Sequence, residues 1–311
     1  MPELSNIAYV FPGQGSQKVG MGRDLYDNFA PAKNIIHQPD EVLGFPLTKL
    51  CFEGPEDELR QTVNAQPALV TMSYACLKSA LALNENEKVP GPALLAGHSL
   101  GEYTALAIAG VLDFPTTVFL ARERGRLMQE AGQKTPGSMA AILGMDEKTV
   151  LSICQETGTW LANINCPGQL VISGATENVE EAIALAKSRG AMRAMMLQVS
   201  GAFHTPLMQP AAEGISAIIA RLSFKDPAIP VIANSSAQPL ASAQAVKAEL
   251  LEQLSHSVQW QRSIEYMITG GVSTFIEIGA GKVLTGLIKR INKNVKTLNV
   301  GEVGELKNIL G

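Results

Sequence analysis

The chain has 311 residues, of which 46% are hydrophobic and 17% are charged, and its formal net charge is -4. These values are typical of a globular protein with a full core, either one large domain or a large domain carrying a smaller one, and they exclude disorder along most of the length. The negative balance does not favour a nucleic-acid binder, because phosphate recognition needs a concentrated basic surface.

The N-terminal residues and the cysteines indicate a cytoplasmic protein. Residues 1–6 lack a positive region ahead of an apolar core, so we expect no secretory signal. The four cysteines form no C-x-x-C pair, so we expect neither a metal site nor a redox motif, and a reducing compartment is their simplest location. The apolar segment 65–83 includes Gln66, Pro67 and Lys78, so we interpret it as a buried helix rather than a membrane span.

Short apolar runs alternate with longer helical patterns, which indicates parallel strands joined by crossover helices. Between residues 138 and 197 the order becomes strand, helix, two strands, helix, strand, which is the layout of a small ferredoxin-like unit. The strands expected for the parallel sheet are residues 7–11, 93–96, 231–233 and 274–278, and those named for the small unit are 139–143, 170–173 and 192–197.

Turn-rich segments at residues 134–137 and 199–201 bound the small unit, as expected for an inserted domain. We therefore predict an α/β fold with an α/β-hydrolase-like core and a mostly parallel sheet. In this prediction, residues 1–134 and 201–311 form a discontinuous catalytic domain, and residues 135–200 form an inserted ferredoxin-like α+β domain.

Residues 97–101 match the motif G-x-S-x-G, with an expected strand before them and a helical pattern at 102–109 after them. The glycines let a strand turn sharply into a helix and lift the Ser99 hydroxyl clear of the backbone. The turn also places Ser99 at a helix N-terminus, where the Leu100 N–H is available to stabilise a developing oxyanion. This context favours a nucleophile over a chance match of the motif.

A serine nucleophile needs a base, and the sequence has four histidines. His98 is a poor candidate, because consecutive side chains on a tight turn diverge, and we expect it to pack under the turn. His37, His204 and His256 remain. His204 stands on a loop just before a helix that Thr205 is expected to cap. His37 and His256 lie among polar residues, where histidines are more often solvated than catalytic.

Seven short motifs follow one another along the chain: F-P-G-Q-G-S-Q at 11–17, Q-P-A at 66–68, G-H-S-L-G-E at 97–102, R-G at 124–125, N-C-P-G-Q at 165–169, F-H at 203–204 and V-Q-W at 258–260. In this order they resemble the malonyl-CoA:acyl carrier protein transacylases, the acyltransferase family of fatty-acid and polyketide synthesis. The resemblance spans nearly the whole chain, and it covers both general fatty-acid synthesis and specialised pathways.

The resemblance implies a role for each matching residue. Ser99 is the implied nucleophile, and His204 is its general base and acid. The second ring nitrogen of His204 is held by a backbone carbonyl, implied to be that of Gln253, so no triad aspartate is expected. The oxyanion hole is assigned to the backbone N–H groups of Gln14 and Leu100, and the adjoining glycines let the backbone approach the acyl group closely.

Arg124 resembles the family arginine that holds the free carboxylate of malonate, and a planar guanidinium suits bidentate pairing with a carboxylate. Arg122 and Arg126 lie two positions away on the same expected helix, 116–130, so at most one of the three faces a cleft. A charge-assisted hydrogen bond contributes about 1.5 to 3 kcal/mol, which implies a roughly ten- to hundredfold preference for malonyl over acetyl.

Three further residues match family positions near the acyl pocket. Phe203 resembles the malonyl-selective form of its motif, in which a bulky ring crowds an α-methyl branch. Gln66 and Asn165 match polar positions of the pocket, and either residue is equally compatible with a structural turn or cap.

The implied partners are malonyl-CoA and an acidic acyl carrier protein, with the coenzyme A thioester as substrate and no cofactor. Both partners favour basic residues at the mouth of the cleft, although charge runs are as often merely solvated. We expect a monomer that binds neither nucleic acid nor membrane. The basic candidates are Lys187, Arg189 and Arg193 in the small unit and Lys282, Lys289, Arg290 and Lys293 near the C-terminus.

The sequence thus predicts a malonyltransferase that supplies fatty-acid chain elongation by ping-pong transfer, through an ester on Ser99, to the phosphopantetheine thiol of the carrier. One alternative is a serine thioesterase or other hydrolase of acyl thioesters, in which water resolves the ester. Another is a non-catalytic scaffold that binds acyl carriers. Arg124 favours transfer over hydrolysis, and the complete set of Ser99, His204 and Arg124 argues against a scaffold.

Overall fold

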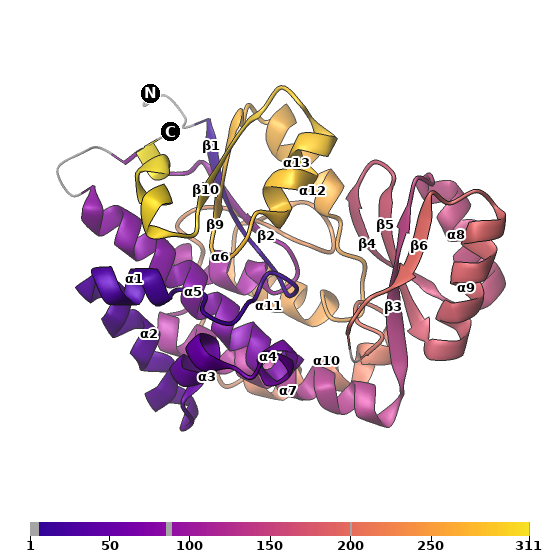
Figure 1. The fold of residues 1–311 in the computed structure, drawn as a ribbon, viewed down its shortest axis with the longest axis horizontal. Helices are drawn as coiled ribbons and strands as arrows, with labels where there is room; N and C mark the ends of the chain where they lie inside the picture. The colour runs from indigo at the N-terminus through magenta and orange to yellow at the C-terminus, as the bar shows by residue number, and fades with distance from the viewer. Residues whose placement is uncertain (1–5, 85–88, 200, 311) are drawn as a thin grey trace.

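The computed structural model describes residues 6–84, 89–199 and 201–310 and contains a six-stranded and a four-stranded sheet (Figure 1). Predictions for residues 1–5 and for Ser200, which concern the secretory signal and one domain boundary, lie outside the described residues. The strands are β1 (Ile7–Phe11), β2 (Leu94–Gly97), β3 (Gly137–Leu143), β4 (Trp160–Cys166), β5 (Gln169–Ala175), β6 (Arg193–Met196), β7 (Val231–Ile232), β8 (Pro239–Leu240), β9 (Thr274–Ile278) and β10 (Lys296–Val300).

Helices pack around both sheets. The predicted buried helix is confirmed as α5, most of whose side chains are buried. Among the described residues, no helix is both long enough and apolar enough to cross a membrane. The helices are α1 (Arg23–Asn28), α2 (Ala30–Leu43), α3 (Leu47–Glu53), α4 (Glu56–Arg60), α5 (Thr62–Leu83), α6 (Gly101–Ile108), α7 (Phe114–Lys134), α8 (Glu147–Thr157), α9 (Thr176–Ser188), α10 (Gln209–Ile219), α11 (Ala243–Glu252), α12 (Trp260–Thr269) and α13 (Val283–Ile291), with 3₁₀ segments η1 (Pro206–Met208) and η2 (Val303–Leu310).

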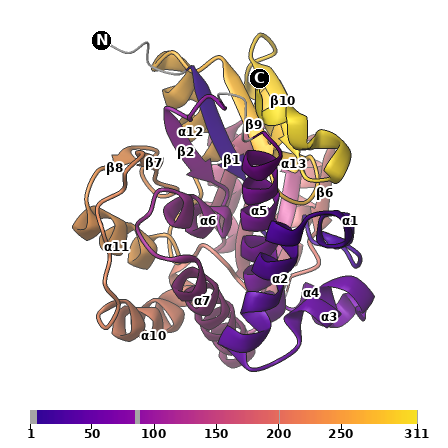
Figure 2. The same cartoon turned by 90° about the vertical axis from the view of Figure 1, so that its left-hand side faces the viewer.

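The six-stranded sheet has the order β10-β9-β1-β2-β7-β8, and its pairs are parallel except that of β7 with β8. Its inner strands are almost entirely buried because helices cover both faces (Figures 1 and 2). Along β1, Ile7 and Phe11 belong to the core shared with α5, α6 and α7, whereas Ala8 and Val10 pack on the opposite face with residues of α12 and α13. The mostly parallel sheet of the prediction is therefore confirmed.

The four strands predicted for this sheet are β1, β2, β7 and β9, although β2 begins one residue later than expected, at Leu94. The strands that the sequence does not predict, β8 and β10, are the two edges of the sheet. An edge strand pairs on one side only and is partly solvated, so it does not need a continuous apolar run. The mixed composition of β10, which begins at Lys296, is an example.

The four-stranded sheet has the antiparallel order β4-β5-β3-β6 and lies on the right of Figure 1, with α8 and α9 on its outer side. The predicted sequence of strand, helix, two strands, helix and strand is confirmed. Side chains alternate between its faces, as expected for strands. Ala140 and Ile172 pack against α8 and α9, whereas Met139 and Val171 belong to the core of the larger unit.

The parallel pairing of β1, β2 and β7 brings the carboxyl ends of these three strands to one edge of the sheet. The residues that follow the three strands include Gln14, Ser99 and Asn234. Ligands of parallel α/β sheets bind at this edge, because loops from several strands meet there. The fold therefore gathers these polar groups from distant parts of the chain.

The turn between β2 and α6 packs its backbone directly against neighbouring backbone. A Cβ atom added at Gly101 would lie 2.0 Å from the carbonyl oxygen of Phe11, and one added at Gly97 would lie 1.8 Å from the carbonyl carbon of Gly101. Atoms at such distances overlap, so neither position has room for a side chain. The two outer glycines of the G-x-S-x-G motif are thus required by packing.

We expect Gly101→Ala to lower the free energy of unfolding by about 3 kcal/mol, the upper end of the range for overpacking, because β1 cannot move away without disrupting the sheet. Urea unfolding followed by circular dichroism measures the change. Gly286→Ala is the matched control, because Gly286 is exposed on α13 with no atom in the way of a Cβ. It should be neutral or stabilising by up to about 1 kcal/mol. Equal stability of the two variants would contradict the argument.

Candidate active site

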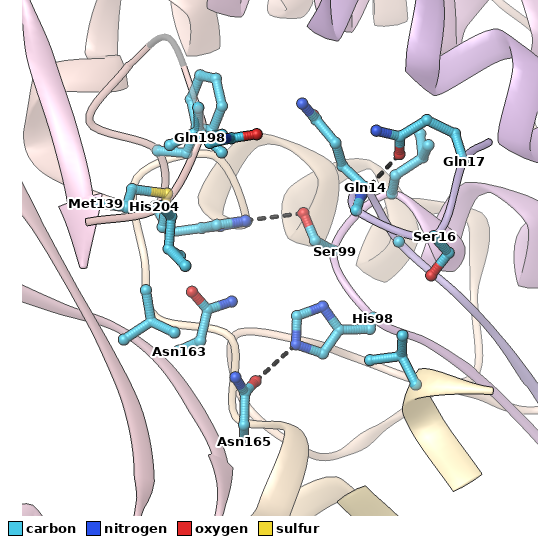
Figure 3. A pocket seen from close by; sticks show the side chains of 18 of the residues that line it. Gln14, Ser16, Gln17, His98, Ser99, Met139, Asn163, Asn165, Gln198 and His204 are labelled. Atoms are coloured by element: carbon cyan, nitrogen blue, oxygen red, sulfur yellow. Dashed lines mark hydrogen bonds between the residues drawn. The ribbon is translucent and has the colours of Figure 1, made fainter. Parts of the chain in front are cut away.

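A cavity of about 490 Å³ opens between the carboxyl ends of β1 and β2 and the inner face of the four-stranded sheet (Figure 3). Of the site residues that the sequence predicts, all except Gln66 and Gln253 line this cavity. Those on its wall are Gln14, His98, Ser99, Leu100, Arg124, Asn165, Phe203 and His204.

Ser99 directly follows β2 and has a φ of 49°, in the left-handed region that residues other than glycine rarely adopt. Such a conformation costs of order 1–3 kcal/mol and persists only where the surrounding structure holds it. The Ser99 N–H donates to Oδ1 of Asn234 at 2.7 Å, and the Ser99 hydroxyl lies 2.8 Å from Nε2 of His204 (Figure 3). The strained turn therefore directs the hydroxyl at an imidazole.

His204 is fixed by its second ring nitrogen. Nδ1 lies 2.8 Å from the backbone carbonyl oxygen of Gln253. Because a carbonyl only accepts hydrogen bonds, Nδ1 carries the proton and Nε2 is left to accept from the Ser99 hydroxyl. Thr205 caps the following 3₁₀ turn, as predicted, since its side chain accepts from the Leu207 N–H.

Burial, and after it the positive charge of Arg124, lowers the pKa of His204 to about 3. The imidazole is therefore neutral at pH 7, which is the state that accepts a proton. A backbone carbonyl beside Nδ1 holds the ring without adding a full negative charge. The low dielectric of the site thus keeps His204 ready to act as a base.

Arg124 reaches the same cavity from α7, where its side chain is buried. Nη1 donates to Oε1 of Gln66 at 2.8 Å, and Nη2 donates to Oε1 of Gln253 at 2.9 Å and to Oγ of Ser99 at 3.2 Å. The guanidinium also lies over the ring of Tyr103, 5.3 Å from its centroid. These partners are neutral. Burial lowers the pKa of Arg124, but a guanidinium keeps its proton in proteins, so Arg124 is a buried cation beside the nucleophile.

The other two arginines of this helix face elsewhere. Arg122 donates to the backbone of α5, and Arg126 pairs with Glu123 and Glu130 on the surface of α7. The prediction that at most one of the three faces the cleft is therefore confirmed.

The loop after β1 brings a second backbone N–H close to Ser99. A Cβ atom at Gly13 would lie 2.4 Å from the carbonyl oxygen of His98, so the loops that follow β1 and β2 are in contact. Both Gln14 and Leu100 line the cavity. Across the described ranges, neither of their backbone N–H groups donates to another protein group. Two residues that line the cavity thus have backbone donors without a protein acceptor in the described part of the chain.

The remaining predicted residues support this arrangement. Nε2 of His98 lies 2.8 Å from Oδ1 of Asn165, and the His98 ring packs 5.5 Å from the ring of Trp260, so His98 is held apart from the Ser99 hydroxyl (Figure 3). Phe203 is buried beside His204. Gln66 lies behind the cavity wall, where it holds Arg124.

Neither of the other two histidines is among the described residues that line the cavity. His37 is exposed and hydrogen-bonded to the Tyr26 hydroxyl, and His256 is exposed near the end of α11. The expectation that both are solvated is confirmed.

Sequence analysis does not identify Asn234 and Glu102 as site residues. Besides accepting from the Ser99 N–H, Asn234 donates from Nδ2 to the carbonyl of Gly97 at 2.7 Å. Glu102 is buried directly behind the turn and accepts from Asn234. Two features of the sequence could have identified them: Asn234 is a polar residue just after a predicted strand, and Glu102 is a carboxylate on a mostly apolar helix.

Comparison with known proteins identifies the family. The acyl transferase domain matches residues 8–307. The malonyl CoA-acyl carrier protein transacylase of Bacillus subtilis is 47% identical over 304 residues, which cover 96% of this chain and 94% of that protein. The solved acyl-carrier-protein S-malonyltransferase of Bartonella henselae is 42% identical with a TM-score of 0.92, and the match covers 98% of each chain.

A second solved structure is a malonyl transacylase in complex with a type II polyketide synthase acyl carrier protein. It is 39% identical, with a TM-score of 0.94 and coverage of 98% of this chain and 99% of that one. On this full-length similarity in sequence and fold, the chain belongs to the acyl transferase family, among the malonyl-CoA:acyl carrier protein transacylases.

Proposed function

We propose that this protein transfers a malonyl group from malonyl-CoA to the phosphopantetheine thiol of an acyl carrier protein through an ester on Ser99. The names of its relatives, and the complex of one relative with its carrier protein, support this pair of substrates. The observation that carries the proposal is the meeting of three groups in one cavity. Ser99 Oγ lies 2.8 Å from Nε2 of His204 and 3.2 Å from Nη2 of Arg124.

In the first half of the reaction, Ser99 Oγ attacks the thioester carbonyl of malonyl-CoA while its proton passes to Nε2 of His204. The oxyanion that develops accepts from the backbone N–H groups of Gln14 and Leu100. The C–S bond then breaks, and the leaving thiolate takes the proton from Nε2. The products are free coenzyme A and malonyl-Ser99.

The second half runs the same steps in reverse with a different thiol. The carrier thiol gives its proton to Nε2 of His204, and the thiolate attacks the carbonyl of malonyl-Ser99. The ester C–O bond breaks, and Ser99 Oγ regains the proton. The proposed scheme uses no cofactor, because each half exchanges only an acyl–sulfur bond, an acyl–oxygen bond and a proton among groups already named.

Arg124 is proposed to select the acyl group. A malonyl unit attached to Ser99 Oγ carries its free carboxylate a few bonds away, within reach of the Nη groups of Arg124. The guanidinium is buried among neutral partners, so a carboxylate that reaches it is paired in a low dielectric. Phe203, buried on the cavity wall, is proposed to crowd acyl groups with an α-methyl branch.

The basic residues near the C-terminus are the favoured docking surface for the acidic carrier. Arg290 donates to Gln169, which lines the cavity, and Lys282 precedes Val283, which also lines it. Arg189 of the small unit is paired with Glu156 and Lys282 is paired with Glu305, so the preference for the C-terminal group rests on its place beside the cavity. A carrier protein bound at the C-terminal group would present its thiol directly to the cavity mouth.

The domain division is likewise proposed. We assign residues 1–134 and 201–311 to an α/β-hydrolase-like catalytic domain and residues 135–200 to an inserted ferredoxin-like domain. The antiparallel sheet with two helices on one face supports the second assignment, and the strand–turn–helix around Ser99 supports the first. A monomeric state and a cytoplasmic location stay predictions.

We expect labelled malonyl-CoA to leave one malonyl group on Ser99, which added carrier protein then removes as malonyl-carrier. Intact-protein mass spectrometry before and after addition of the carrier measures both steps. Ser99→Ala should take up no label. Rapid release of free malonate instead would identify a thioesterase, and the absence of any covalent label on the wild type would identify a scaffold.

We expect Arg124→Ala to reduce the ratio of kcat/KM for malonyl-CoA over acetyl-CoA by roughly ten- to hundredfold, because the variant lacks the buried cation that pairs with the malonyl carboxylate. Initial rates with the two thioesters measure the ratio. Arg126→Ala is the matched control on the same helix, since Arg126 pairs with Glu123 and Glu130 and does not line the cavity. An unchanged ratio in Arg124→Ala would show that the carboxylate is bound elsewhere.

The acidic limb of the pH profile of kcat/KM should lie far below the pH range in which histidines ordinarily titrate. Protonated His204 cannot act as a base, but its pKa is lowered to about 3, so the free enzyme keeps the neutral form as the pH falls. We therefore expect kcat/KM for Ser99 malonylation to stay level through about pH 6.5, the ordinary pKa of histidine. Quenched-flow labelling across the acid range measures it. A midpoint near that ordinary value would refute the buried, neutral base.

A further inference from the structure

We propose that Glu102 is a positioning residue, which orients Arg124 and the Ser99 turn through the amide side chains of Gln253 and Asn234. This inference rests on the proposed function of the cavity. Glu102 ends the G-H-S-L-G-E motif and lies on α6 with 0% of its surface exposed. Burying a carboxyl group is unfavourable unless its hydrogen bonds offset the loss of hydration.

One oxygen of Glu102 collects three donors. Oε2 accepts from Nε2 of Gln253 at 3.0 Å, from the backbone N–H of Asn234 at 3.1 Å and from Nδ2 of Asn234. Within the described part of the chain, the other oxygen, Oε1, is buried without a hydrogen-bond partner. The role of Glu102 is therefore concentrated in a single acceptor atom, and both of its partners are amides.

The amide of Gln253 lies between a group that only accepts and a group that only donates. Its Nε2 donates to Glu102 and, at 3.1 Å, to the carbonyl of Ser99, while its Oε1 accepts from Nη2 of Arg124 at 2.9 Å. Rotating the amide by half a turn would place NH₂ against the guanidinium and oxygen against the carboxyl oxygen, losing these bonds. Glu102 thus determines which end of Gln253 faces Arg124.

The amide of Asn234 is oriented by the same oxygen. With Nδ2 directed at Glu102 and at the Gly97 carbonyl, Oδ1 is left to accept from the Ser99 N–H at 2.7 Å. That bond supports Ser99 in its left-handed conformation, which is unfavourable by itself. One acceptor atom therefore supports the nucleophile on one side and the specificity residue on the other.

Gln253 also connects this network to the base, because its main-chain carbonyl accepts from Nδ1 of His204 at 2.8 Å. Burial, and then the nearby Glu249, raises the pKa of Glu102. A proton on this carboxyl would sit on the unpartnered Oε1, and Oε2 would accept in either state. The proposed role therefore needs an acceptor oxygen at this position and does not need a negative charge.

Two substitutions at Glu102 test whether an acceptor oxygen is required. Glu102→Gln keeps an oxygen that accepts, so it should retain the wild-type ratio of kcat/KM for malonyl-CoA over acetyl-CoA. Glu102→Leu removes the acceptor and frees both amides, so the ratio should fall by about tenfold, as for the loss of one well-placed bond to a charged group. A merely structural residue would instead lower both rates by one factor and leave the ratio as it was, and that result would overturn the proposal.

Glu277→Leu is the control for loss of a buried carboxylate. Glu277 is as buried as Glu102 but bonds to Leu284 and Thr285 at the start of α13, away from both amides. The Glu277→Leu variant should have lower thermal stability and an unchanged ratio of kcat/KM for malonyl-CoA over acetyl-CoA. Should Glu102→Leu fail to fold, Gln253→Leu decides the question, because it removes the side-chain link to Arg124 and keeps the main-chain carbonyl that holds His204. A wild-type ratio in Gln253→Leu would overturn the proposal.

The wild-type enzyme separates this inference from the proposed function. If the wild type forms no malonyl-Ser99, the proposed function fails. If it forms the ester with a preference for malonyl, and Glu102→Leu keeps that preference, only the role of Glu102 fails.

Discussion

The contact between the turn after β2 and the end of β1 is the constraint on which the site depends. The backbone of Gly101 lies against the carbonyl of Phe11, which leaves the turn little room, and Ser99 has a left-handed conformation within this turn. The strain is offset by the rigid parallel pairing of the two strands and by the bond from the Ser99 N–H to Asn234. In this conformation, the Ser99 hydroxyl points away from the edge of the sheet toward His204.

Burial then sets the chemistry of the charged groups around this hydroxyl. It lowers the pKa of both His204 and Arg124, and the charge of Arg124 lowers that of His204 further. In the proposed mechanism, a malonyl carboxylate beside Arg124 offsets that charge, so the imidazole becomes more basic once the correct acyl group is bound. An acetyl group brings no such charge. Selection of the acyl group and activation of the nucleophile are therefore electrostatically linked.

The amide residues complete the site without taking part in bond making. Gln66, Gln253 and Asn234 each present oxygen to one group and nitrogen to another. Because an amide both donates and accepts, it can join a cation, a carboxyl and a backbone group that would not pair directly. The site is thus held by oriented dipoles, and Arg124 brings a buried guanidinium into contact with the Ser99 hydroxyl.

Features that depend on neighbouring residues were predictable from the sequence, whereas features that depend on contacts between distant residues were not. An inner strand such as β1 was predictable because burial on both faces leaves a continuous apolar run, whereas the partly solvated edge strand β10 leaves no such run. Ser99 was predictable from its local turn, but Arg124 only through resemblance to a family, since its spacing to Arg122 and Arg126 does not say which of them is buried. Glu102 was missed, because its partner Asn234 lies 132 positions away.

The sequence by itself determined the local features of this protein: the succession of strands and helices along the small unit, the sharp serine turn, the capped loop of His204 and the membership of a family. Only the tertiary structure decided which groups face one another. The Gln253 carbonyl accepts from Nδ1 of His204, the amides of Gln66 and Gln253 accept from Arg124, and Oε2 of Glu102 accepts from Gln253 and Asn234. The physical reason is that turns and amphipathic periods are encoded over a few neighbouring residues. Desolvation and hydrogen-bond direction, by contrast, depend on side chains that meet only when distant strands pair.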